Sequence, residues 1–193
     1  TIRLKTTLKK RMWKFIYFNI NILLYLYSGI DHTFVRTNIC YQAIAAYTQQ
    51  INNDMVNYLA VMGKGKVSFC DVTDVVNVLT DIITAEVPSQ HYNKVYSVTG
   101  PVELSIEEIA ATIQKVCSTK LIFDFHYNKT TKDDEKKIWM DMLGELLKRC
   151  NEGYFAMISK DVQMLVGTPA KSFVDWLTEN DKNKELFLPS KIK

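Results

Sequence analysis

Apolar residues along the chain fall into short runs that predict strands and longer periodic segments that predict helices. The runs VSFC at 67–70 and KVYSVT at 94–99 have the length and the β-branched content of strands. The segment that follows the first run predicts a helix, which begins at Asp71 or Thr73 and ends before Pro88. Apolar residues at i, i+3 and i+4 form its predicted core-facing side, which carries Val72, Val75, Val76, Leu79, Ile82 and Ile83.

Capping signals predict further helices. Ser105 and Glu108 form a capping box, in which each side chain accepts the other's backbone amide at the helix start. Ser172, with Asp175 three residues on, predicts the start of a second helix. We also expect strands at 30–36 and 121–127, helix and loop over 39–59, an amphipathic helix from Asp133 to Cys150, a short helix before Gly167, and a poorly ordered polar tail from Asn180. Strands that alternate with helices in this way predict an α/β protein.

The N-terminal segment, residues 1–27, has three interpretations. Its apolar part, MWKFIYFNINILLYLY at 12–27, follows the basic stretch 3–11. This run is shorter than the roughly 20 apolar residues of a spanning helix, and Lys14 and two asparagines interrupt it. We expect a buried helix, with a membrane anchor and an incorrectly assembled N-terminal sequence as alternatives. Because the first residue is Thr1, we also expect that the chain lacks its beginning or was processed.

Charge and cysteine usage narrow the class of protein. The net charge is only +3 and acidic residues alternate with basic ones, so we expect no nucleic-acid partner. The cysteines are widely and singly spaced, without a C-x-x-C pair. This spacing predicts reduced, mostly buried thiols in a cytoplasmic protein, no disulfide framework and no metal site. The four cysteines are Cys40, Cys70, Cys117 and Cys150.

Motifs of hydrolytic and metal-dependent catalysis are absent from the sequence. It has no nucleophile elbow, P-loop, H-E-x-x-H or EF-hand loop. The glycines and lysines of 63–66 precede a strand, whereas a phosphate-binding loop follows one, so they predict a turn. No Tyr has a Lys four residues on, and Asp71 and Asp74 lie where capping explains them. The sequence therefore leaves the catalytic residues unknown, and His32, His91 and His126 are interpreted as solvated or hydrogen-bonded side chains.

Four motifs, taken in order, resemble the second half of the NmrA-like family, an atypical branch of the short-chain dehydrogenases. Residues 28–36 resemble its SG-I-x-x-T-x-x-R strand, and 66–75 resemble its V-x-F-x-D-V-x-D-V strand-to-helix motif. Residues 99–110 resemble TGP-x-x-x-S-x-x-E-I-A, and 165–169 resemble the closing L-x-G-x-P. The resemblance implies a partial Rossmann-like fold, a doubly wound parallel sheet without its N-terminal nucleotide-binding strands and with a small α+β substrate subdomain.

The resemblance also implies a cofactor and a site. Residues 28–180 would form the NmrA-like C-terminal region, followed by a polar tail at 181–193. NADP(H) or NAD(H) would bind the complete protein, with Arg36, Thr37 and Asn38 on the nicotinamide side. Alternatively, Arg36 pairs with a nearby carboxylate. Two departures matter: the sequence has no G-x-x-G-x-x-G loop, and Thr37 stands where the family has Pro.

The resemblance leaves several functions open. The family contains reductases and redox sensors without turnover, and we expect the chain alone to be inactive and to bind no dinucleotide tightly. The substrate is unknown. A second interpretation is a protein-interaction module, or self-association, through an exposed sheet edge. A third is membrane tethering through residues 12–27.

Overall fold

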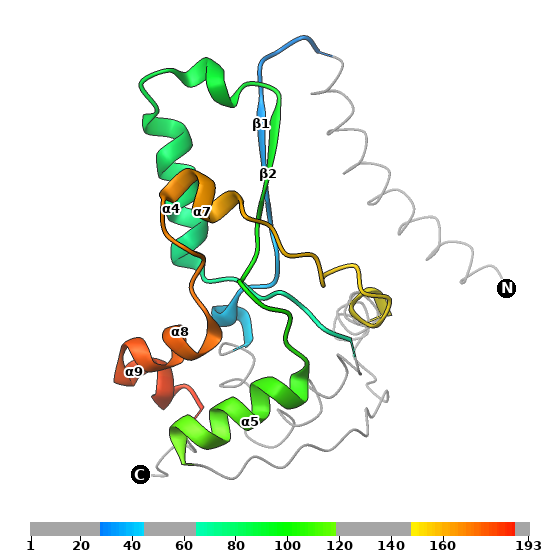
Figure 1. Ribbon diagram of the computed structural model, residues 1–193, viewed down its shortest axis with the longest axis vertical. Helices are drawn as coiled ribbons and strands as arrows, with labels where there is room; N and C mark the ends of the chain where they lie inside the picture. The colour runs from blue at the N-terminus through cyan, green and yellow to red at the C-terminus, as the bar shows by residue number, and fades with distance from the viewer. Residues whose placement is uncertain (1–27, 45–64, 119–147, 188–193) are drawn as a thin grey trace, which may run out of the picture. The chain divides into compact units, whose positions relative to one another are not determined.

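The computed structural model describes residues 28–44, 65–118 and 148–187 (Figure 1). The predicted helix at 12–27, the strand at 121–127 and most of the helix ending at Cys150 lie outside the described residues. None of the helices in the described ranges has the length and hydropathy that crossing a membrane requires. The chain divides into two compact units, and residues 28–34 and 87–95 belong to the first of them.

Within the described residues, two parallel strands form a sheet. They are β1, Thr33–Thr37, and β2, Lys94–Val98, drawn side by side in Figure 1. Their direction follows from hydrogen bonds at the two ends, since the Asn93 amide donates to His32 O and the Asn38 amide to Val98 O. The strands predicted at 30–36 and 94–99 are thus confirmed, with shifted ends.

The predicted strand at 67–70 is extended but does not form a regular ladder. All four of its residues are buried. Cys70 makes a parallel bridge with Cys40, and Val67 makes an antiparallel bridge with Leu104. The segment therefore pairs with two different neighbours, through one bridge each, and neither pairing is long enough to form a strand.

The helix α4, Val72–Thr84, begins where the sequence predicts, because the Asp71 side chain accepts the Thr73 amide. Its predicted inward face is wrong in part. Val78 is fully buried, with Val75 and Ile82 packed beside it. Exposed apolar side chains form a stripe along the outer face, which consists of Val72, Val76, Leu79 and Ile83. The reason is a narrow contact area: α4 packs against the short helix α7, Asp161–Val166 (Figure 1).

The larger core lies around the helices α5, Ile106–Cys117, and α8, Phe173–Glu179. The predicted caps are confirmed at both, with Ser105 and Glu108 forming the capping box of α5 and Ser172 accepting the Asp175 amide at α8. The core residues are Tyr41, Ile44, Val67, Phe69, Ile106, Ile109, Ile113, Cys150, Phe173, Trp176, Leu177 and Phe187.

The expectation of a poorly ordered tail from Asn180 is wrong for 181–187. These residues contain helix α9, Asp181–Glu185, whose first turn Asn180 caps. Asn183 Nδ2 donates to Trp176 O at 2.6 Å, and Phe187 is buried in the larger core. One aromatic anchor and two side-chain hydrogen bonds thus order a segment whose composition is polar.

Two glycines are required by close packing. A β-carbon at Gly100 would overlap the carbonyl oxygen of Phe69, and one at Gly65 would overlap the carbonyl of Cys150. Gly65 belongs to the glycine-lysine segment at 63–66. The close approach of the Cys150 backbone therefore explains the glycine at position 65.

Val78→Ala and Val76→Ala form a matched pair on α4. We expect Val78→Ala to lower the free energy of unfolding by about 2–3 kcal/mol, because it removes two buried methyl groups and leaves a cavity. Val76 is 52% exposed, so its replacement should change stability by less than about 0.5 kcal/mol. Urea denaturation measures both. Equal losses at the two positions would contradict the buried face assigned here.

Candidate functional site

The candidate site lies at the carboxyl ends of β1 and β2, where ligands bind in open α/β sheets. Arg36 and Thr37 are the last residues of β1, and both are exposed. Asn38 follows them and is half-buried, with its amide bound to Val98 O at 3.0 Å. The three residues predicted from the sequence are thus consecutive at this edge, but their environments differ.

The side chain of Asn38 is occupied by contacts within the protein. Its Nδ2 donates to Ser68 Oγ and to Phe155 O, both at 2.9 Å, and its Oδ1 accepts the Ile39 amide at 2.8 Å. Asn38 therefore shapes the edge by joining three segments. Within the described ranges, no carboxylate lies at ion-pair distance from Arg36.

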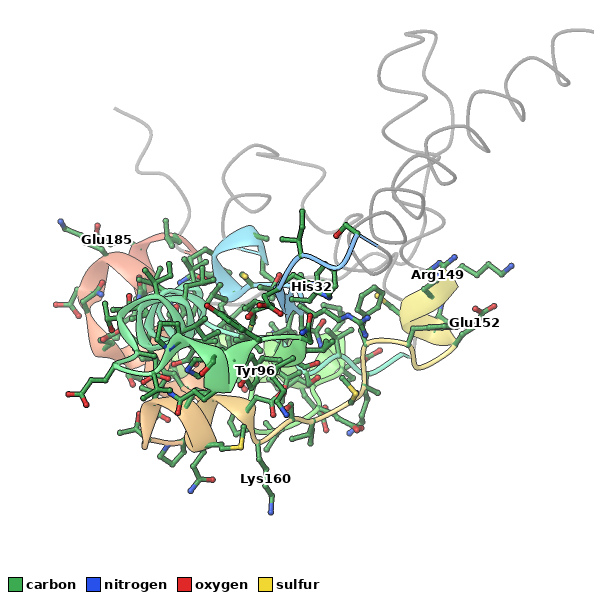
Figure 2. The ribbon with its side chains drawn as sticks, turned by 90° about the horizontal axis from the view of Figure 1, so that it is seen from above. His32, Tyr96, Arg149, Glu152, Lys160 and Glu185 are labelled. Atoms are coloured by element: carbon green, nitrogen blue, oxygen red, sulfur yellow. The ribbon has the colours of Figure 1, made fainter. Side chains whose placement is uncertain are left out.

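The segment 155–159 is attached along the same edge. Ser68 donates its amide to Phe155 O at 2.9 Å and its hydroxyl to Met157 O at 2.5 Å. The Ser159 amide donates to Thr99 Oγ1 at 2.9 Å. Lys160 follows the segment and extends away from the ribbon (Figure 2). These contacts could not be predicted from the sequence, because they link residues that lie far apart along the chain and belong to no motif.

The amide of Ser97, on β2, is bound by a side chain. It donates to Asp161 Oδ2 at 2.6 Å, at the start of α7. A carboxylate therefore takes up a strand amide that would otherwise be available to another strand. The contact occupies one amide on this side of β2.

A buried carboxylate anchors the elements beneath the site. Asp71 Oδ1 accepts from Gln42 Nε2 at 2.5 Å and from the Thr73 amide at 3.2 Å. Its Oδ2 lies 3.1 Å from Lys171 Nζ, and its side chain is 1% exposed. The sequence identified the cap but not the lysine, which lies far along the chain.

The two aspartates of this network titrate in opposite directions. Burial raises the pKa of Asp71, but hydrogen bonds from Gln42, Lys171 and Thr73 outweigh it and hold the pKa below the ordinary 3.8. Burial raises the pKa of Asp74, and the nearby charge of Asp71 adds to the rise. The Lys171 amide, which donates to Asp74 Oδ2 at 2.9 Å, offsets only part of it. Asp71 is therefore the stronger acid of the pair, and the Lys171 ammonium lies against its carboxylate.

The three histidines were the other candidates for acid–base chemistry. His32 Nδ1 lies 2.8 Å from Ile30 O, and His91 is buried. Both belong to the first unit, whereas Asn38 belongs to the second. His126 lies outside the described residues. Among the described residues, no group of three or more His, Cys, Asp and Glu side chains is arranged for a metal ion.

The cysteines are free thiols, but they are not all isolated. Cys70 and Cys150 are buried, and Cys40 and Cys117 are half-buried. Cys40 and Cys70 lie next to each other, with 3.7 Å between their sulfur atoms. Sequence spacing could not reveal this pair, since the two cysteines meet only through the pairing of two extended segments.

Comparison with known proteins finds similarities in sequence and in fold. The sequence is 28% identical over 158 residues to an NAD(P)H azoreductase of Xenophilus azovorans, covering 77% of this chain and 52% of that protein. The structure matches a nucleoside-diphosphate-sugar epimerase of Staphylococcus aureus with a TM-score of 0.70 and 21% identity, over 83% of this chain and 57% of that one. It also matches an NADPH-dependent quinone oxidoreductase of Escherichia coli, with a TM-score of 0.63, 18% identity, and coverage of 86% and 58%.

These matches confirm the resemblance to the NmrA-like family. No protein-family model matches the sequence. The chain has an α/β fold with parallel strands, and proteins similar to it include NAD(P)H-dependent oxidoreductases. It spans little more than half the length of these relatives. The matched structures therefore establish the fold, and the activity of a complete protein is a separate question.

Lys171→Met tests the buried ion pair, with Lys148→Met as its control. We expect Lys171→Met to lower the free energy of unfolding at pH 7 by about 3 kcal/mol, because it leaves the buried Asp71 carboxylate without its counter-charge. Lys148 pairs with Glu152 at 3.9 Å on the surface, so its loss should cost less than about 0.5 kcal/mol.

The same variant has a defined pH dependence. The pKa of Asp71 is lowered in the folded state, so the stability from the ion pair is complete above the ordinary value of 3.8 and is lost as the pH falls through the folded pKa. The difference between wild type and Lys171→Met should therefore shrink between pH 7 and pH 3. Urea denaturation at both pH values measures it, and a constant difference would contradict the assignment.

Proposed function

We propose that this chain forms the substrate-side part of an NmrA-like reductase, which uses NAD(P)H to reduce a small organic acceptor. The observation that carries the proposal is the exposed Arg36 at the carboxyl end of a parallel strand, on an edge held in shape by Asn38. The azoreductase and the quinone oxidoreductase are the relatives that suggest the class of acceptor, an azo compound or a quinone.

The residues at this edge fit one part of a dinucleotide. A guanidinium without a neighbouring carboxylate in the described ranges can bind a phosphate or a carboxamide oxygen by charge-assisted hydrogen bonds. Bound nicotinamide would supply the hydride. The protein's part is to orient the ring and the acceptor: Arg36 and Thr37 would contact the ligand, and Asn38 would keep their backbone in place by holding Phe155 and Ser68.

We further propose that these 193 residues do not bind the dinucleotide tightly by themselves. The printed sequence contains no glycine-rich loop of the G-x-x-G-x-x-G kind, which would place the pyrophosphate at a helix N-terminus. Hydrogen bonds to the nicotinamide side alone leave most of the ligand in water. The same site is compatible with a redox sensor that binds the dinucleotide without turnover. Such a sensor would differ from the proposed reductase only in having no acceptor to reduce.

Titration of the 193-residue chain with NADPH tests the cofactor part of this proposal. We expect no saturation of the nicotinamide fluorescence change below about 1 mM, equivalent to a binding free energy weaker than about −4 kcal/mol. Saturable binding in the micromolar range would show that residues other than a glycine-rich loop hold the pyrophosphate, and would contradict the proposal.

Arg36→Ala tests the site in the longest polypeptide that the reading frame of these residues encodes. We expect the unmutated polypeptide to reduce a quinone or an azo dye with NADPH. In Arg36→Ala, the KM for NADPH should rise by about 10- to 100-fold, because one charged hydrogen bond is lost. Lys94→Ala, at the amino end of β2, removes an equal charge and should leave KM unchanged. Absence of any reductase activity would contradict the function; activity with an unchanged KM in Arg36→Ala would contradict the site.

Expectations about partners and location stay predictions. A protein partner or self-association remains an alternative function, and size-exclusion chromatography with light scattering distinguishes a monomer from an oligomer. Membrane tethering would depend on residues 12–27, which lie outside the described residues. Flotation with liposomes tests it directly.

A further inference from the structure

Cys40 and Cys70 occupy directly opposed positions on two neighbouring extended segments. The Tyr41 amide donates to Cys70 O at 2.9 Å, and the Cys70 amide donates to Ile39 O at 3.1 Å, which makes the two cysteines partners in a parallel bridge. Their sulfur atoms are 3.7 Å apart. Both thiols also lie near the carbonyl oxygen of Asn38, at 3.8 Å from Cys40 and 3.5 Å from Cys70.

We propose that Cys40 and Cys70 form a redox-active dithiol that peroxides oxidise to a disulfide, and that thiols reduce again. The backbone geometry permits this bond. Neighbouring strands lie about 4.8 Å apart, within the range of about 4.4–6.8 Å between α-carbons that disulfides span. The sulfur atoms need only approach from 3.7 Å to about 2.05 Å, through rotation of the two side chains. No rearrangement of the fold is required.

The surroundings of the two thiols indicate which of them reacts first with the oxidant. Cys40 is half-buried and so accessible to a small oxidant, whereas Cys70 is fully buried. The hydrogen bond with Cys70 lowers the pKa of Cys40 to about 7, although burial and the charge of Asp71 act in the other direction. The same hydrogen bond and burial raise the pKa of Cys70. Cys40 is therefore the more acidic and more nucleophilic thiol of the pair, and Cys70 stays protonated.

Two steps complete the oxidation. The Cys40 thiolate attacks one oxygen of hydrogen peroxide, the O–O bond breaks, and Cys40 becomes a sulfenic acid while hydroxide leaves and takes up a proton as water. Cys70 then attacks the Cys40 sulfur, the S–O bond breaks, and the Cys70 proton leaves with the hydroxyl group as a second water. The sum is two thiols and one peroxide giving one disulfide and two waters, with two electrons transferred from sulfur to oxygen.

The disulfide would lie beside the candidate site and the buried carboxylate. It would link the segment that begins at Asn38 to the segment that ends at Asp71. The hydrogen bond from Gln42 to the Asp71 side chain already joins the same two segments. Oxidation would thus fix the two segments whose relative position sets the carboxyl edge. This inference does not depend on the proposed reductase activity, because it needs no cofactor and has its own chemical readout.

Mapping of the thiols in the 193-residue chain tests the proposal. The reduced protein is treated with hydrogen peroxide at pH 7.4, quenched with catalase, alkylated, digested and analysed by mass spectrometry. We expect a peptide pair joined through Cys40 and Cys70, two hydrogens lighter than the reduced pair, which dithiothreitol restores. Burial raises the pKa of Cys150 to about 11, so Cys150 is the internal control. Loss of the Cys40 and Cys70 thiols should be on the order of 10- to 100-fold faster than loss of the Cys150 thiol.

Two variants assign the steps. In Cys70→Ser, we expect Cys40 to stop at the sulfenic acid, which dimedone traps, and in Cys40→Ser no intramolecular disulfide should form. Cys150→Ser should form the Cys40–Cys70 disulfide at the wild-type rate. The proposal is overturned if both thiols of the wild type remain as alkylatable as Cys150 after excess peroxide, or if Cys40 proceeds to the sulfinic acid without a crosslinked peptide. Because the wild-type map needs no variant, a variant that fails to fold does not weaken the test.

Discussion

The fold of the second unit depends on one buried charge. The Asp71 carboxylate accepts the Thr73 amide at the start of α4 and the side-chain amide of Gln42, two residues after Cys40. It also lies against the ammonium group of Lys171, which precedes α8. An isolated carboxylate in this position would be expensive to bury, so its three partners must be assembled together. One side chain thus links the start of a helix, the residues that follow the Cys40 bridge and a distant loop.

The candidate site depends on the same assembly. The extended segment that ends in Asp71 contains Ser68, which holds the segment 155–159 by hydrogen bonds, and Cys70, which pairs with Cys40. Asn38 joins these parts at the end of β1. The hydrogen bonds of Asn38, Ser68 and Thr99 are used to build the edge. Arg36 and Thr37 at this edge are exposed, which is why we propose them as ligand contacts, and Cys40 is the half-buried member of the cysteine pair.

Local signals in the sequence were reliable where one hydrogen bond decides the structure. The capping box of Ser105 and Glu108, the cap at Ser172 and the cap at Asp71 are found as predicted, since each donor lies within three residues of its acceptor. Periodicity was less reliable. It identified α4 as a helix but assigned Val76 and Ile83 to the core, because a nearly continuous valine and isoleucine pattern does not say which side meets a neighbour.

By itself, the sequence determined the α/β class, the positions of the helix starts and the NmrA-like resemblance, because each depends on residues close together along the chain. Only the tertiary structure decided that Lys171 neutralises Asp71, that Asn38 is taken up by Ser68 and Phe155, and that Cys40 meets Cys70. These contacts join segments far apart in sequence. Their partners are selected by backbone pairing and by the need to satisfy buried polar groups, neither of which leaves a fixed spacing to be recognised.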